Sequence, residues 1–170
     1  MRKPKYEVYY GGLSSGKSSY AQSKVDPKET LVVGTGSQIL DWVYLRPGAT
    51  KRHITEITEA GFESRQNANP SRIADLCRDI EKPVLLIDDW ATLFRDSIFW
   101  PMEKIKETCH DCFSAINSNN NLERAIFVVW DSQIWLPFGL YKKRALWNKE
   151  LFKVADEITR LDYGIPLRIK

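Results

Sequence analysis

The chain has 170 residues and a mass of 19.7 kDa, which fits a single domain over residues 1–170. Apolar residues make up 43% of the sequence and charged residues 28%, a composition that predicts a packed core and argues against wholesale disorder. The net charge of +3 is too small to indicate nucleic acid as a partner.

The sequence also argues against a membrane or secreted protein. No apolar run approaches the ~18 residues of a membrane span, and the first residues do not have the pattern of a signal peptide. The 3 cysteines are an odd number in a chain too large to need disulfide bonds. We therefore expect a soluble, reduced, cytoplasmic protein without a membrane partner.

Short apolar runs alternate with longer segments of mixed polarity, which is typical of strands that alternate with helices. Strands are predicted at Tyr6–Tyr10, Leu31–Val33, Val84–Ile87 and Ala125–Trp130. The last three of these lack polar alternation, as expected for parallel strands covered on both faces. Helices are predicted at Lys17–Lys24, Ser71–Ile80, Pro101–Ile116 and Leu140–Ala155. The pattern indicates a doubly wound α/β domain.

The sharpest motif follows the first predicted strand and opens the first predicted helix. It reads Gly11-Gly12-Leu13-Ser14-Ser15-Gly16-Lys17-Ser18 and satisfies the phosphate-loop pattern Gly-x-x-x-x-Gly-Lys-Ser. Its glycines let backbone N–H groups surround a phosphate, Lys17 would reach the outer phosphates, and Ser18 would place its hydroxyl on Mg²⁺. The motif predicts that the chain binds a nucleoside triphosphate, ATP or GTP, with Mg²⁺. The expected fold is a single P-loop NTPase domain, a mostly parallel RecA-like sheet with helices on both faces.

An acidic pair, Asp88 and Asp89, ends the third predicted strand. A carboxylate at the carboxyl edge of the sheet, on a strand neighbouring the phosphate loop, could hold Mg²⁺ directly or through water. Aspartate is also a common helix N-cap, so a capping role stays open.

Two further stretches extend the pattern over most of the chain. The first, after the second predicted strand, reads Gly34-Thr35-Gly36-Ser37-Gln38-Ile39-Leu40-Asp41. The second consists of Asn148-Lys149-Glu150-Leu151, Val154-Ala155-Asp156-Glu157-Ile158 and Gly164-Ile165-Pro166-Leu167-Arg168-Ile169-Lys170. With the phosphate loop, this order resembles the adenosylcobinamide kinase/adenosylcobinamide-phosphate guanylyltransferase family of cobalamin biosynthesis.

The resemblance implies an enzyme with two steps. A nucleoside triphosphate phosphorylates a hydroxyl of a corrinoid acceptor, and GTP then transfers GMP to an active-site histidine and on to that phosphate. It also implies that His53, beside Arg52, is the nucleophile, that Asp89 rather than Asp88 is the acidic residue, and that the chain forms a homotrimer. Further nucleotide contacts are implied at Thr35, Gly36 and Ser37.

Three alternatives remain open at this point. His53 could be an ordinary surface histidine in a polar loop. The chain could be a P-loop kinase or NTPase with another acceptor. It could also be an accessory or virus-encoded nucleotide-binding protein that uses its phosphate loop for assembly or switching.

Three other groups of residues favour structural roles. The Cys109-His110-Asp111-Cys112 spacing suggests zinc, but a structural site needs four ligands, so packing of the cysteines in the core is predicted. The tryptophans near strands or proline are predicted in the core or at a subunit contact: Trp90, Trp100, Trp130 and Trp135. The basic run Lys142-Lys143-Arg144 is predicted as a solvated helix face.

Overall fold

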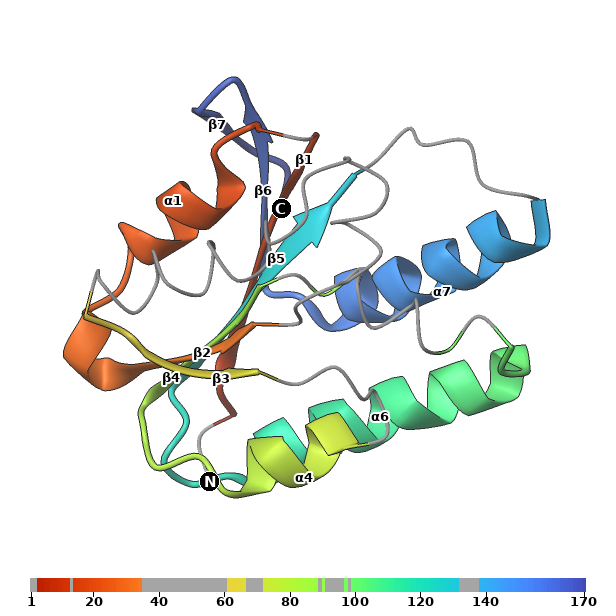
Figure 1. The fold of residues 1–170 in the computed structure, drawn as a ribbon, viewed down its shortest axis with the longest axis horizontal. Coiled ribbons are helices and arrows are strands. Elements are labelled where there is room, and N and C mark those ends of the chain that lie inside the picture. Colours follow the sequence, from red (N-terminus) through yellow and green to blue (C-terminus); the bar gives the residue numbers. More distant parts are fainter. Residues whose placement is uncertain are drawn as a thin grey trace.

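The computed structural model describes residues 3–12, 14–34, 61–66, 72–88, 90, 97, 99–131 and 138–170. Their strands form one seven-stranded sheet in the order β3-β2-β4-β5-β1-β6-β7 (Figure 1). The bounds are β1 Lys5–Gly11, β2 Thr30–Gly34, β3 Glu63–Gln66, β4 Val84–Asp88, β5 Arg124–Trp130, β6 Glu157–Asp162 and β7 Ile165–Arg168. Every neighbouring pair is parallel except β6 and β7. The sheet is therefore mostly parallel, as predicted.

Helices cover both faces of this sheet. The α-helices in the described residues are α1 Lys17–Gln22, α4 Ile73–Arg78, α6 Met102–Ser118 and α7 Phe138–Val154, and Pro27–Glu29 forms a 3₁₀ turn. Helices α4, α6 and α7 pack on one side of the sheet, and α1 lies on the other (Figure 1). The predicted α/β architecture with helices on both faces is confirmed. None of the helices in the described ranges is long and apolar enough to cross a membrane.

Aromatic side chains fill the larger core, on the side of α6 and α7. Tyr6 stacks on Phe127 with ring centroids 5.9 Å apart, and Trp90 meets Phe127 edge-on at 5.2 Å. The Trp90 indole N–H donates to the carbonyl oxygen of Trp147 at 3.2 Å, so this buried tryptophan keeps its polar atom satisfied. The predicted core position of Trp90 is confirmed. Trp100 and Trp130 are half-buried, and Trp135 lies outside the described residues.

The cysteines lie in the same core. Cys77, Cys109 and Cys112 are reduced and buried between α4 and α6, which confirms the prediction of core packing. Burial raises the pKa of the Cys109 thiol, and a hydrogen bond with Cys77 together with burial raises that of Cys112. The Cys109 and Cys112 thiols are therefore protonated at neutral pH.

The basic run Lys142-Lys143-Arg144 was predicted to be a solvated helix face, and this prediction is wrong at Arg144. Arg144 is buried, donates to the carbonyl oxygen of Trp130, and places its guanidinium 5.4 Å from the centre of that indole ring. The run is thus not a solvated face at this position. Arg144 ties α7 to the carboxyl end of β5, since an arginine can cover an aromatic ring and bind a carbonyl at the same time.

Candidate functional site

The phosphate loop links the end of β1 to the start of α1. Ser14 and Gly16 both have positive φ, 55° and 84°, and these left-handed residues turn the chain back over the sheet. Gly16 fits this conformation without the steric penalty of a side chain. The Lys17 ammonium donates to the carbonyl oxygen of Gly12 at 2.7 Å and lies 3.5 Å from the Ser15 hydroxyl oxygen. Lys17 therefore lies across the loop, where a bound phosphate would meet its charge.

Two neighbouring segments hold the loop from either side. On the β5 side, the Asp131 N–H donates to the carbonyl oxygen of Gly11 at 2.9 Å. On the β6 side, the Gly164 N–H donates to the carbonyl oxygen of Ser15 at 3.0 Å, from the turn that joins β6 to β7. The loop is thus fixed between the end of β5 and the β6–β7 turn.

The acidic strand end is not next to β1, which corrects the expectation from sequence. β5 lies between β1 and β4, and Asp88 pairs with Val128, which in turn pairs with Tyr9. Residues paired across parallel strands point to the same face, and Val128 and Tyr9 pack with Ala21 of α1. The buried Asp88 carboxylate therefore lies on the α1 side of the sheet, the side that carries Lys17 and Ser18.

Several predicted site residues lie outside the described residues: Leu13, Thr35, Gly36, Ser37, His53 and Asp89. They remain predictions from the sequence. The described part of the predicted site is Gly11, Gly12, Ser14, Ser15, Gly16, Lys17, Ser18 and Asp88.

Among the described residues, no group of three or more histidine, cysteine, aspartate or glutamate side chains could hold a metal ion. Mg²⁺ binds through one or two protein oxygens and completes its shell with water and phosphate oxygens. Ser18 and Asp88 are of the right type for the protein part of such a shell.

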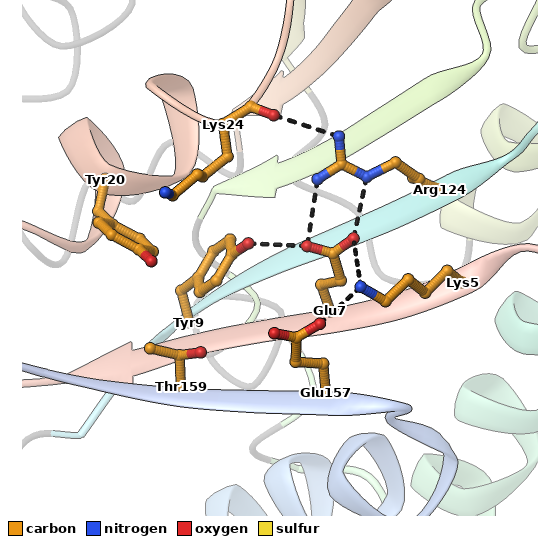
Figure 2. Close-up of a pocket in the computed structure, with 8 residues that line it drawn as sticks. All are labelled: Lys5, Glu7, Tyr9, Tyr20, Lys24, Arg124, Glu157 and Thr159. Atoms are coloured by element: carbon orange, nitrogen blue, oxygen red, sulfur yellow. Dashed lines mark hydrogen bonds and ion pairs between the residues drawn. The ribbon is translucent and has the colours of Figure 1, made fainter. Parts of the chain in front are cut away.

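A cavity of about 410 Å³ lies on the same face of the sheet as α1, but toward the amino ends of the strands (Figure 2). It is lined by Lys5, Glu7, Tyr9, Tyr20, Lys24, Arg124, Glu157 and Thr159. None of these residues is part of the predicted site.

The buried Glu7 carboxylate organises this cavity. Arg124 donates to both of its oxygens, at 2.9 and 3.1 Å, and the Tyr9 hydroxyl donates at 2.7 Å (Figure 2). Lys5 pairs with Glu157 at 2.5 Å and lies 3.4 Å from Glu7. Burial alone would raise the pKa of Glu7, but the hydrogen bonds from Arg124 and Tyr9 outweigh it and hold the pKa below its ordinary value of 4.5. The network joins β1, β5 and β6. In the sequence it is indicated only by Glu7, a charged residue inside an apolar strand.

We expect Arg124→Met to lower the free energy of unfolding by about 2 kcal/mol at pH 7, because it leaves a buried carboxylate without its guanidinium. In the native protein the pKa of Glu7 is depressed, so its stabilisation is present at neutral pH and is lost as the pH falls through that pKa. In the variant the lowering by Arg124 is lost, so the pKa of Glu7 rises, and protonation toward acid relieves the poorly compensated buried charge. Urea unfolding at pH 7 and pH 4 measures the effect. The difference in the free energy of unfolding between the native protein and Arg124→Met should be smaller at pH 4.

Arg78→Met is the matched control, since Arg78 pairs with Asp75 on an exposed helix surface. It should change the stability by less than about 1 kcal/mol at pH 7. An Arg124→Met deficit that is the same at both pH values would show that lost packing, and not the ion pair, is responsible.

Comparison with known proteins supports the fold. No protein-family model and no curated protein matches the sequence. An ATPase from the type III secretion system of pathogenic bacteria superposes with a TM-score of 0.51 at 12% identity, over 98% of this chain and 58% of that one. The RadB recombinase superposes with a TM-score of 0.50 at 13% identity, over 93% of this chain and 74% of that one.

The chain thus spans little more than half the length of the secretion ATPase. At such low identity the likeness concerns the fold alone. Together with the sheet order, it supports the predicted RecA-like α/β fold.

Proposed function

We propose that the chain binds a nucleoside triphosphate with Mg²⁺ at the phosphate loop and cleaves or transfers its terminal phosphoryl group. The observation that carries this proposal is the position of Lys17, whose ammonium is held 2.7 Å from the carbonyl oxygen of Gly12 across a loop with two left-handed residues. A cation held there meets the outer phosphates without a rearrangement of the backbone.

Each described residue of the site has a role in this proposal. Lys17 exchanges the Gly12 carbonyl for phosphate oxygens and offsets the charge that develops on the transferring group. A Cβ built on Gly12 would have no atom within 4 Å, so this glycine faces open space. In this proposal the phosphate occupies that space, and a side chain at position 12 would obstruct it. Ser18 and Asp88 provide oxygen ligands for Mg²⁺, which supplies positive charge to the phosphates when bound.

The finer function, a kinase and guanylyltransferase acting on a corrinoid, is a second candidate that rests on the sequence resemblance. One observation favours it: the Gly164-Ile165-Pro166 segment that contributes to the resemblance begins in the β6–β7 turn, and its Gly164 N–H is bonded to the phosphate loop at Ser15. The homotrimer and the role of His53 rest on the resemblance alone.

Mass spectrometry of the intact protein after incubation with GTP and Mg²⁺ separates the two candidates. A covalent GMP adduct, lost in His53→Ala, would support guanylyl transfer. Turnover of nucleotide without an adduct would support hydrolysis or a simple kinase reaction, in which His53 has no chemical role.

For the metal, we expect Asp88→Asn to reduce Mg²⁺-dependent turnover roughly 100-fold. The register places this carboxylate on the α1 face, whereas the resemblance favours Asp89. Steady-state turnover as a function of Mg²⁺ concentration, with thermal melting to verify the fold, measures the effect.

Two variants serve as comparisons: Asp89→Asn tests the other aspartate of the pair, and Asp111→Asn changes an exposed aspartate of α6. Asp111→Asn should behave as the native protein. If Asp89→Asn loses activity and Asp88→Asn keeps it, the ligand is Asp89. If both variants keep full activity, the acidic pair has a structural role and the metal is held elsewhere.

A further inference from the structure

The turn between β6 and β7 exposes an aromatic residue beside the phosphate loop. Asp162 pairs with Ile165, so Tyr163 and Gly164 form a two-residue hairpin turn. The Tyr163 residue is 95% exposed. Its neighbour Gly164 donates to the Ser15 carbonyl at 3.0 Å, and a Cβ built on Gly16 would lie 3.4 Å from the Gly164 Cα. The tyrosine is therefore carried on a turn that is fixed to the loop itself (Figure 1).

Tyrosine is an unusual choice at this position. Tyr163 and Gly164 both have positive φ, 49° and 83°, as in the type I′ turns that favour Asn-Gly. A bulky side chain in the left-handed region raises the energy of the backbone, and burial of the ring does not offset this at 95% exposure. The turn alone thus does not account for an aromatic residue, which points to a role for the ring.

The strand order sets the direction of a bound triphosphate. Asp88, the candidate metal ligand, lies on β4, two strands from β1 on the β5 side. Mg²⁺ held by Asp88 would supply positive charge to the outer phosphates, so we expect these phosphates toward that side. The nucleoside end then leaves the loop on the opposite side, where the sheet continues into β6 and β7. Of the residues that the structure describes, Tyr163 is an exposed aromatic one on that side.

We propose that the Tyr163 ring is the platform on which the nucleobase stacks, an inference that rests on the proposed nucleotide-binding function. Stacking uses the π-face that every base has, so the ring contributes affinity without selecting a particular base. The ring raises the affinity for ATP and for GTP alike. It contributes nothing to the binding of a polyphosphate that has no base.

Tyr163→Asn removes the ring and keeps a residue that tolerates the left-handed conformation, so the turn is preserved. Calorimetric titration with Mg²⁺ and ATP, GTP or inorganic tripolyphosphate measures the affinity. We expect roughly tenfold weaker binding of ATP and of GTP, and unchanged binding of tripolyphosphate. Tyr163→Phe should restore the native affinity, since it keeps the π-face and loses only the hydroxyl.

The matched control is Tyr141→Asn, which removes an exposed tyrosine of α7. It should bind all three ligands as the native protein does. Equal ATP affinity of Tyr163→Asn and the native protein would overturn the stacking role while leaving nucleotide binding intact. A loss that is the same for tripolyphosphate would also overturn it, because the turn would then act only through the loop. If the native protein binds none of the ligands, the proposed function itself fails, and the stacking role with it.

Discussion

Lys17→Ala should lower nucleotide turnover at least roughly 100-fold and weaken the binding of both ATP and inorganic tripolyphosphate. In the native protein the ammonium lies within 2.7 Å of the Gly12 carbonyl oxygen, at the centre of the loop. Removal of this charge leaves the outer phosphates without the lysine of the phosphate loop. Because the charge acts on the phosphates, the loss should not depend on the base.

The fold of this variant should be intact, since Lys17 is only partly buried. Circular dichroism and thermal melting verify this point. Lys106→Ala, which changes an exposed lysine of α6, is the control and should retain full turnover. Native-level turnover in purified Lys17→Ala would refute the assignment of the phosphate loop as the active site.

The strands that the sequence reveals are those buried on both faces. β2 and β4 are buried at every residue, and their unbroken apolar runs predict them within one residue of their observed ends. β6 and β7 were not predicted as strands, because both carry polar residues and β7 is exposed along its length. Their pairing depends on β1 and on each other, which a local pattern does not reveal.

The site also has a part that the sequence predicts and a part that it does not. The loop from Gly11 to Ser18 is a local motif, and its geometry follows from the order of its residues. Its neighbours are not local. The contact of Gly164 with Ser15 joins residues about 150 positions apart, and the separation of β4 from β1 by β5 appears only with the strand order. The choice between Asp88 and Asp89 likewise depends on which face of β4 each occupies, which the sequence alone does not define.

Gly11→Ala should be the most destabilising substitution in the loop. A Cβ built on Gly11 would lie 2.3 Å from the backbone oxygen of Leu161 and 2.8 Å from the Ser15 hydroxyl oxygen. The first of these atoms belongs to β6, which pairs with β1 at that position, so it cannot move without breaking the register of two strands. We expect the free energy of unfolding to fall by about 3 kcal/mol.

Gly12→Ala is the neighbouring control, because a Cβ there meets nothing within 4 Å and its backbone is outside the left-handed region. Its stability should stay within about 0.5 kcal/mol of the native protein in urea unfolding without nucleotide. If the two variants unfolded at the same urea concentration, the close packing of β1 against β6 would not be what requires a glycine at position 11. A large deficit confined to Gly11→Ala would show that the fold requires a glycine at position 11 and does not require one at position 12.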